Sequence, residues 1–309
     1  MNKITIIGAG RVGESTAQAI ATRDMAREIV LIDIREGAAE GAALDIQEVA
    51  PLFKFDTRVT GGSDYALMSD SDLIVITAGL PRKPGMSRSD VLGSNIPIID
   101  EIVDAAMKYA PDCILLFVTN PVDVITYYAQ KKTGWSRNRV FGQAGVLDSS
   151  RMSSFIAMET GFSSHDISTM VLGGHGDTMV PMLRYATISG IPVSNFLSQE
   201  KLDAIIERTR NGGAEILTLR QNSSAYDAPA ASVTDMVDSI VNDRKRIMPT
   251  VCLLEGEYGH DDIAIGVPVV LGKNGIEEIF NLQMTDDEKN DFDQSAAIVK
   301  KDIDLLKTL

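Results

Sequence analysis

Residues 4–13 have the sequence Ile-Thr-Ile-Ile-Gly-Ala-Gly-Arg-Val-Gly, and Asp33 stands 20 residues after the last of these glycines. The four residues before the first glycine favour a β-strand because they are apolar or β-branched. The stretch from Val12 to Met25 is compatible with a helix. The order of strand, glycine-rich turn and helix predicts the opening of an α/β fold.

The same alternation continues along the first half of the chain. Continuous apolar runs lie at residues 29–32, 73–76 and 114–117, with a weaker run at 139–141. Runs without polar alternation are typical of parallel strands that are covered on both faces. Helix-compatible stretches lie between them, at residues 38–49, 96–109 and 122–132. The pattern predicts a doubly wound parallel sheet of the Rossmann type, in the α/β class.

The three glycines of residues 8–13 have separate mechanical roles in a phosphate-binding turn. The first makes the tight turn, the second lets a pyrophosphate approach the backbone, and the third lets helix and strand pack closely. Asp33 ends the second predicted strand, where a carboxylate meets ribose hydroxyls and repels a ribose 2′-phosphate, although Arg35 nearby weakens that preference. We predict NAD rather than NADP as the cofactor; the alternative is a turn that only joins strand to helix. The residues predicted to contact NAD here are Gly8, Gly10, Arg11, Val12, Gly13 and Asp33.

The second half of the chain has a different pattern of apolar runs and turns. Apolar runs joined by glycine-rich turns favour antiparallel pairing, and they lie at residues 167–172, 179–188, 251–254 and 263–271. Thr285 followed by Glu288 predicts a capping box at the start of a final helix. We therefore expect two domains, a dinucleotide-binding domain at residues 1–145 and an α+β substrate domain with antiparallel strands at residues 146–309.

Composition excludes several classes of function. The chain has 309 residues, 29 basic and 43 acidic side chains and a formal net charge of −14, which repels nucleic acid and anionic membrane surfaces. The apolar run at residues 113–118 is far shorter than the roughly 20 residues of a membrane-spanning helix. Cys113 and Cys252 lie in apolar runs without neighbouring ligands, which predicts buried reduced thiols and no metal site. With no export signal in the sequence, the expected location is the cytoplasm.

Only three histidines are available for acid–base chemistry. His165 and His260 lie in polar, turn-like sequences and are expected at the surface. His175 lies in Gly-Gly-His-Gly-Asp, residues 173–177, after an apolar run, where small neighbours leave an imidazole accessible at a strand end. His175 is therefore the candidate catalytic base, against the alternative of a histidine that fills a turn.

Three polar residues are candidate partners of this histidine and its substrate. Asp148 and Arg151 are three apart where a helix is expected to begin, so they share a face. A carboxylate there would fix the imidazole tautomer, and a guanidinium would hold a substrate carboxylate. The alternative is an ordinary surface ion pair. Asn120 follows the strand at 114–117, at the sheet edge where ligands bind, or else it caps the next helix.

Residues 78–90 form a segment that is too long and too polar for a simple strand-to-helix turn. They contain two prolines, two glycines and three cations. A loop of this kind at the ligand edge of a sheet predicts a lid over the site. Arg82 and Arg88 are six residues apart, so a closed lid would bring two guanidiniums to one small anion. The alternative is an exposed cationic loop.

These motifs together resemble the NAD-dependent lactate/malate dehydrogenase family, in the family's order and over nearly the whole chain. The resemblance is carried by the glycine turn with Asp33, the two-arginine loop, Val118-Thr119-Asn120-Pro121, Leu147-Asp148-Ser149-Ser150-Arg151 and Gly174-His175-Gly176-Asp177. It implies an enzyme that moves a hydride between an L-2-hydroxy acid and NAD and that assembles as a dimer or tetramer.

The resemblance also implies a role for each candidate residue. His175 would exchange the hydroxyl proton of the substrate, and Asp148 would orient it and stabilise its charged form. Arg151 would anchor the C1 carboxylate, Arg88 would polarise the reacting carbonyl, and Asn120 would hydrogen-bond the same oxygen. The residues implied on the nicotinamide side are Asn95, Val118 and Asn120.

Arg82 is the residue expected to select the substrate. A second carboxylate entering a dry site needs a countercharge, and a methyl group beside an unpaired buried guanidinium is disfavoured. We therefore expect malate and oxaloacetate in preference to lactate and pyruvate. Lactate-specific members generally have a neutral residue at this position, but Gly176 and Asp177 after the histidine resemble theirs. Two alternatives stay open, an L-lactate or broader L-2-hydroxy acid dehydrogenase and a non-catalytic NAD-binding redox sensor.

Overall fold

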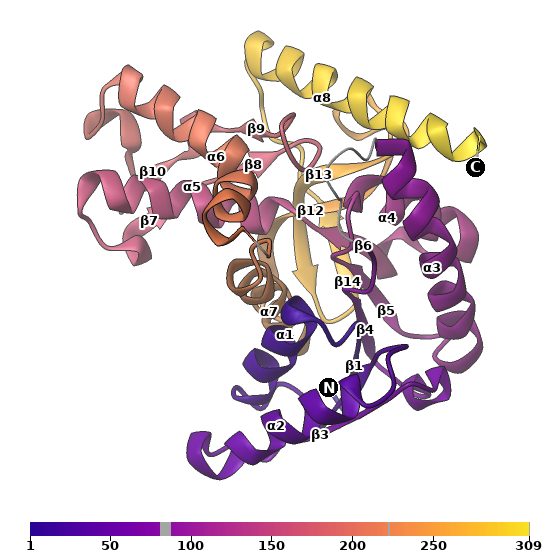
Figure 1. Cartoon of the computed structure of the whole chain (residues 1–309). Helices are drawn as coiled ribbons and strands as arrows, with labels where there is room; N and C mark the ends of the chain where they lie inside the picture. Colours follow the sequence, from indigo (N-terminus) through magenta and orange to yellow (C-terminus); the bar gives the residue numbers. More distant parts are fainter. Residues whose placement is uncertain (81–87, 222, 309) are drawn as a thin grey trace.

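The computed structural model describes residues 1–80, 88–221 and 223–308. Through these residues runs a nine-stranded sheet in the order β14-β13-β12-β6-β5-β4-β1-β2-β3 (Figure 1). Its parallel strands are β1 (Lys3–Ile7), β2 (Glu28–Ile32), β3 (Arg58–Gly62), β4 (Leu73–Ile76), β5 (Ile114–Phe117) and β6 (Val140–Gln143). This arrangement confirms the doubly wound parallel sheet predicted for the first half of the chain.

The antiparallel strands predicted for the second half are also present, and they join the same sheet. They are β12 (Arg246–Glu255), β13 (Asp261–Gly272) and β14 (Gly275–Ile279). β12 pairs with β6 through Thr250 opposite Gln143 and Val251 opposite Gly142, so the sheet continues from one half of the chain into the other. The sequence did not predict this continuity. Its physical reason is that β6 is buried along its whole length, where an uncovered edge would leave backbone groups unpaired.

Two expectations about strands need correction. β3 was not predicted, because an edge strand needs no continuous apolar run and its sequence is Arg-Val-Thr-Gly-Gly. The runs at 167–172 and 179–188 are not continuous strands. A 3₁₀ turn at Leu183–Tyr185 interrupts the second run, and Pro181 has no amide to donate. The short strands of this region are β7 (Ile167–Ser168), β8 (Val171–Leu172), β9 (Val180–Pro181), β10 (Thr187–Ile188) and β11 (Ile191–Pro192).

Helices cover both faces of the parallel strands, and successive strand residues alternate between the two layers. Val75 and Leu116 belong to the core on one face, while Ile76 and Phe117 belong to the core on the other. The helices on the first face are α1 (Arg11–Ala21), α2 (Ala38–Phe53) and α7 (Asp227–Val241). Those on the second face are α3 (Arg88–Tyr109) and α4 (Val122–Thr133).

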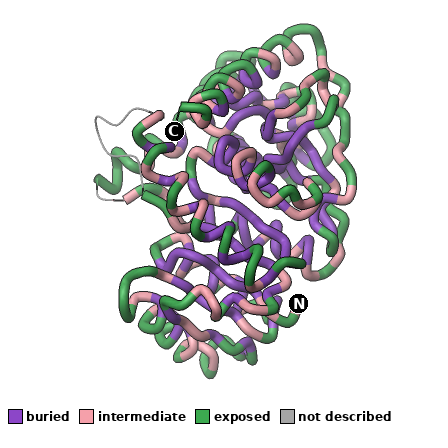
Figure 2. The backbone as a smooth tube through the Cα atoms, turned by 90° about the vertical axis from the view of Figure 1, so that its right-hand side faces the viewer, coloured by how far each residue is buried: buried purple, intermediate pink, exposed green. Residues whose placement is uncertain are grey.

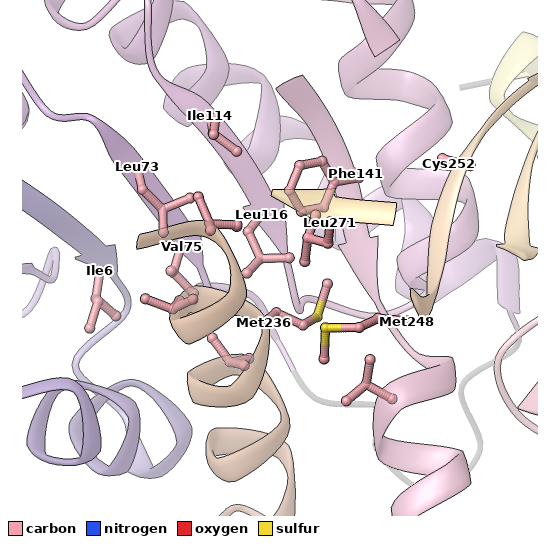
Figure 3. Packing of buried hydrophobic residues seen from close by; sticks show 14 of the residues in the cluster. Ile6, Leu73, Val75, Ile114, Leu116, Phe141, Met236, Met248, Cys252 and Leu271 are labelled. Atoms are coloured by element: carbon pink, nitrogen blue, oxygen red, sulfur yellow. The ribbon is translucent and has the colours of Figure 1, made fainter. Parts of the chain in front are cut away.

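The core on the first face is shared by the two halves of the chain. Met236 of α7 lies beside Met248 of β12, in the same cluster as Leu116 and Phe141 of the parallel strands (Figure 3). Along the tube, the buried segments run through the interior and the exposed ones follow the outer turns (Figure 2). Burial of this shared apolar surface stabilises the two halves together.

The remaining helices are α5 (Gly145–Thr160), α6 (Gln199–Arg220) and α8 (Asp286–Asp304). α5 begins directly after β6, so the boundary expected between residues 145 and 146 falls in its first turn. In α8 the residues Phe292, Ala296, Val299 and Ile303 form a buried apolar stripe that packs in the core. None of the helices in the described ranges is long and apolar enough to span a bilayer.

The two cysteines are buried free thiols, as predicted. Burial raises the pKa of Cys113 and that of Cys252 to about 12, because a thiolate is poorly solvated in an apolar core. Both therefore remain neutral thiols at neutral pH and serve as small apolar core residues.

The capping box predicted for the final helix is present. Thr285 Oγ1 accepts from the Glu288 amide at 3.2 Å, and the Glu288 carboxylate accepts from the Thr285 amide at 2.8 Å. Thr285→Ala should lower the free energy of unfolding by about 1 kcal/mol, because it removes the acceptor of the first helical turn. Thr285→Ser keeps the hydroxyl and is the matched control. Denaturant unfolding of the three proteins checks this expectation, and equal loss in both variants would contradict it.

Candidate active site

The turn between β1 and α1 has the shape that a dinucleotide phosphate requires. Gly8 has a φ of +105°, and a Cβ there would lie 2.7 Å from the Ala78 nitrogen. A Cβ at Gly13 would lie 1.9 Å from the Gly8 carbonyl oxygen, so only glycine lets α1 approach β1 this closely. At Gly10 no atom of the described residues lies within 4 Å of the Cβ position. The turn is therefore tight where strand and helix meet and open where a phosphate would approach.

The N-terminus of α1 is suited to an anion. Gly10 precedes the helix and has no side chain to cap it, so the first-turn amides are available to a phosphate. Arg11 and Val12 are the first two residues of the helix. The Arg11 guanidinium carbon lies 5.3 Å from the centroid of the ring of Tyr226, which directly precedes α7.

Asp33 follows β2 at the same sheet edge, and Arg35 covers its carboxylate. Asp33 Oδ1 accepts from the amide of Arg35 at 2.9 Å and from its Nε at 3.0 Å. Oδ2 accepts from the Ala9 amide at 2.9 Å and from Arg35 Nη2 at 3.1 Å. Burial alone would raise the pKa of Asp33, but these hydrogen bonds outweigh it and hold the pKa below its ordinary value. Since a carboxylate has about four acceptor positions, Ala9 and Arg35 occupy the acceptor capacity of Asp33.

Asn95 of α3 joins the turns that follow β4 and β5. Its Oδ1 accepts from the Leu80 amide at 2.7 Å, and its Nδ2 donates to the carbonyls of Leu80 at 3.2 Å and Asn120 at 2.9 Å. The side chain is buried and engaged with backbone on both sides, so it holds the two turns in register. Val118 is half-buried directly after β5, and its amide donates to Ile76. Asn120 is exposed, and no side chain caps α4, so the alternative of a helix cap is wrong.

His175 lies in the turn between β8 and β9, and α5 brings Asp148 to its ring. The Nδ1 atom of His175 lies 2.9 Å from Oδ2 of Asp148, which is almost wholly buried. Burial alone would lower the pKa of His175, but the charge and hydrogen bond of Asp148 outweigh it and raise the pKa above its ordinary value. The contact with Nδ1 leaves Nε2 as the nitrogen available to a substrate.

The backbone amides of this turn donate hydrogen bonds that fix it to the rest of the fold. Gly173 pairs with β13 in a short antiparallel bridge. The Gly174 amide donates to Oγ of Ser295 in α8 at 2.9 Å, and the His175 amide donates to Oδ2 of Asp123 in α4 at 3.0 Å. The turn is therefore fixed to both halves of the chain, and the imidazole lies at the carboxyl edge of the parallel strands.

Asp123 is a functional candidate that the sequence analysis missed. It is 5% exposed in the first turn of α4, and burial raises its pKa to about 6. Its Oδ1 has no hydrogen-bond partner among the described residues. The sequence signal was concealed because an aspartate in a first helical turn has an ordinary structural explanation, the helix dipole. Asp123 is therefore a second buried carboxylate next to His175, in addition to Asp148.

Arg151 lies one helical turn along α5 from Asp148, as their spacing predicts. Its Nη1 donates to Asp148 Oδ1 at 3.2 Å, and its side chain is only 12% exposed. The Nε atom is buried and has no hydrogen-bond partner in the described part of the chain. A half-satisfied buried guanidinium favours an anionic ligand, because unpaired buried donors are costly.

Some predicted residues lie elsewhere or cannot be placed. Arg82 and the side chain of Arg88 lie outside the described residues, although the backbone of Arg88 begins α3. The predicted lid, residues 78–90, is described only at its two ends. His165 is exposed, as expected. His260 is half-buried, and its Nε2 lies 2.7 Å from Oδ1 of Asp293.

The described residues of the site combine acid–base chemistry with anion binding. An imidazole, two carboxylates and a guanidinium meet beside the sheet edge that also bears the glycine turn. Such a set can exchange a proton with an alcohol while it holds a carboxylate, next to a bound dinucleotide. In the described part of the chain, no group of three or more His, Cys, Asp or Glu side chains is arranged to hold a metal ion.

Comparison with known proteins covers both halves of the chain. Residues 2–142 match the family model described as lactate/malate dehydrogenase, NAD binding domain. Residues 145–309 match the model described as lactate/malate dehydrogenase, alpha/beta C-terminal domain. The malate dehydrogenase of Thioalkalivibrio sulfidiphilus is 66% identical over 307 residues, which cover 99% of this chain and 100% of that protein.

Solved structures agree with these matches. The malate dehydrogenase of Picrophilus torridus in its apo form is 44% identical, with a TM-score of 0.96 over 99% of this chain and 98% of that one. The lactate dehydrogenase of Cryptosporidium parvum, solved with lactic acid and nicotinamide adenine dinucleotide, is 37% identical, with a TM-score of 0.96 over 100% of this chain and 98% of that one. With both halves matched and full-length relatives this similar, the chain belongs to the lactate/malate dehydrogenase family.

Proposed function

We propose that the protein is an NAD-dependent malate dehydrogenase, which oxidises (S)-malate to oxaloacetate and catalyses the reverse reaction. The observation that carries the proposal is the contact of Asp148 with both His175 and Arg151, at the sheet edge that bears the glycine turn. Curated malate dehydrogenases between 48% and 66% identical over nearly the whole chain support malate as the substrate. The assay that tests it is NADH oxidation with oxaloacetate and with pyruvate in parallel.

The glycine turn fits NAD on the geometry described above. The open space at Gly10 would leave room for the pyrophosphate, and the first-turn amides of α1 would donate to it. The carboxylate of Asp33 would accept the ribose hydroxyls in place of the Arg35 guanidinium. When bound, NAD accepts a hydride at its nicotinamide ring and returns it in the reverse direction.

His175 moves the proton. In malate oxidation its Nε2 accepts the hydroxyl proton, and in oxaloacetate reduction it returns that proton to the developing alkoxide. Asp148 holds the Nδ1 proton in place, which fixes the tautomer, and its charge stabilises the imidazolium. Because Asp148 is buried and the His175 side chain is only 18% exposed and held by Asp148, little reorganisation is needed when the charge moves.

Cationic and amide groups hold the substrate. Arg151 binds the C1 carboxylate through its remaining donors, which the structure leaves unpaired at Nε. Asn120 and Arg88 act on the C2 oxygen, where negative charge develops during reduction. Arg82 neutralises the second carboxylate, and this pairing separates oxaloacetate from pyruvate.

The remaining statements of the proposal concern organisation and location. Residues 1–145 bind NAD, and residues 146–309 supply the acid–base and anchoring groups. We expect a dimer or tetramer, and support comes from the large apolar side chains that α2 exposes, which are Leu44, Leu52 and Phe53. We expect the enzyme in the cytoplasm, where free thiols such as its two cysteines stay reduced.

Substitution of Arg82 tests substrate selection. Arg82→Gln should reduce kcat/KM for oxaloacetate by about 100-fold or more and raise that for pyruvate, because a carboxylate would lose its countercharge in a dry site. Lys83→Gln is the matched control, since it removes a neighbouring positive charge and should change either value by less than about threefold. Oxaloacetate kinetics in Arg82→Gln equal to those of the wild type would contradict the assigned role.

The pH dependence tests the His175–Asp148 pair. Oxaloacetate reduction needs protonated His175, so kcat/KM falls as pH rises through the His175 pKa, which Asp148 raises. Asp148→Asn removes that charge, so the falling limb should move to lower pH and kcat should drop at least about tenfold. Asp166→Asn removes an exposed carboxylate and should keep the wild-type profile. A falling limb at the wild-type pH in Asp148→Asn would show that this carboxylate does not set the His175 pKa.

The ion pair over Asp33 predicts that Arg35 competes with the cofactor. Arg35→Ala should strengthen NADH binding by about three- to fivefold, because the ribose would no longer have to displace a guanidinium. Arg58→Ala, at the start of β3 and so at the amino end of the parallel strands, makes the same charge change and serves as the control. Fluorescence titration with NADH gives the dissociation constants. Weaker NADH binding in Arg35→Ala would mean that Arg35 holds the cofactor instead.

A further inference from the structure

The buried face of α6 has a glycine, Gly212, where it meets Arg151 of the active site. The buried residues of this helix are Leu202, Ile205, Thr209 and Gly212, spaced by three, four and three positions. That spacing forms one stripe along the helix. Leu202 and Ile205 lie in the same apolar cluster as Met152 of α5. At Gly212 the stripe continues without a side chain.

The side chain of Arg151 occupies the space next to Gly212. A Cβ at position 212 would lie 3.1 Å from Arg151 Cδ, 3.4 Å from its Nε and 3.8 Å from its Cγ, and these are the three nearest atoms. The 3.1 Å between this Cβ position and Arg151 Cδ is shorter than an ordinary van der Waals contact, so Arg151 would have to move by a few tenths of an ångström. Gly213 is different, because a Cβ there would lie 3.6 Å from Arg151 Nη2, an ordinary van der Waals distance.

Backbone conformation does not explain the glycine at 212. The residue is helical and does not have a positive φ. Inside a helix, glycine is less stable than alanine, because its backbone loses more conformational freedom on folding. A glycine on the buried stripe of a helix therefore needs another reason, and the contact with Arg151 supplies one.

We propose that Gly212 is a positioning residue for the substrate anchor: its missing side chain leaves the space in which the Arg151 guanidinium is held against Asp148. The inference rests on the proposed function, in which Arg151 binds the C1 carboxylate of the substrate. Gly212 acts through Arg151, and its own contribution is the absence of a methyl group.

The surroundings of Arg151 explain why a small displacement matters. On one side its Nη1 is bonded to Asp148 at 3.2 Å, and on the other its side chain lies against α6. The side chain is only 12% exposed, which leaves it little room to move toward solvent. A two-point contact between guanidinium and carboxylate depends on placement to within about 0.5 Å. A methyl group at 212 would move the Cδ and Nε of Arg151 relative to Asp148.

Such a displacement has a distinctive kinetic effect. An anchor for a non-reacting carboxylate binds the substrate and the transition state alike, so weakening it raises KM and leaves kcat nearly unchanged. A general loss of structure in α6 would lower kcat and the fraction of folded protein as well. The separation of KM from kcat therefore distinguishes a positioning role from a merely structural one.

Gly212→Ala and Gly213→Ala form the matched pair that tests the inference. Both replace a glycine by alanine in the same turn of α6, but only the first places a methyl group against Arg151 Cδ. Gly212→Ala should raise KM for oxaloacetate at least about fivefold, with kcat and the NADH dissociation constant within about twofold of wild type. Gly213→Ala should keep all three values within about twofold and raise the thermal midpoint, because alanine favours the helix.

The outcomes separate this inference from the proposed function. An unchanged KM in Gly212→Ala, or an equal rise in Gly213→Ala, overturns the positioning role. A wild-type protein that does not reduce oxaloacetate contradicts the proposed function instead. In that case oxalate, titrated into the NADH complex of each protein, measures the anchor without turnover, and a loss of oxalate affinity confined to Gly212→Ala supports the role while equal affinities overturn it.

Discussion

The carboxylate of Asp148 is the group on which the rest of the site depends. Its Oδ2 lies 2.9 Å from the His175 ring and its Oδ1 lies 3.2 Å from Arg151, while the residue itself is 1% exposed. Burying a carboxylate costs free energy unless its oxygens are paired. The imidazole and the guanidinium therefore stabilise the buried Asp148 carboxylate, and the carboxylate in turn orients both groups. Removal of any one member leaves a charge or a polar atom without its partner. The three residues therefore act as a coupled unit, whose energies do not add.

The fold brings this unit to the cofactor through backbone geometry. Parallel strands place their carboxyl ends at one edge, and the turns after β1, β2, β4 and β5 supply the glycines, Asp33 and the Asn95-linked segments there. α5 starts directly after β6 and carries Asp148 to the same edge. The turn of His175 reaches it because its amide bonds to Asp123 in α4. Residues far apart in the sequence thus meet at positions set by strand ends and helix starts.

The sequence predicted the parts of the molecule whose signal is local. Continuous apolar runs marked most of the parallel strands, and Thr285 with Glu288 marked the last helix, because these patterns reflect short-range physical requirements. The pairing of β12 with β6 depends on contacts between distant segments, and β3 lacks an apolar run because it lies at an edge. Asp123 was missed for a related reason: what distinguishes it is burial next to His175, which only the tertiary structure reveals.

The continuity of the sheet has a consequence for the evolution and engineering of this family. The first family match ends at residue 142 in β6 and the second begins at residue 145, where α5 starts, but Thr250 and Val251 pair with β6 across that division. A fragment cut there would open a buried strand on each side, and open strands recruit other chains. In a hybrid that combines halves of two relatives, β6 would come from one protein and β12 from the other. These paired strands would then have to match in twist and in side-chain volume. Recombination is better tolerated at the outer loops, which make no such demand.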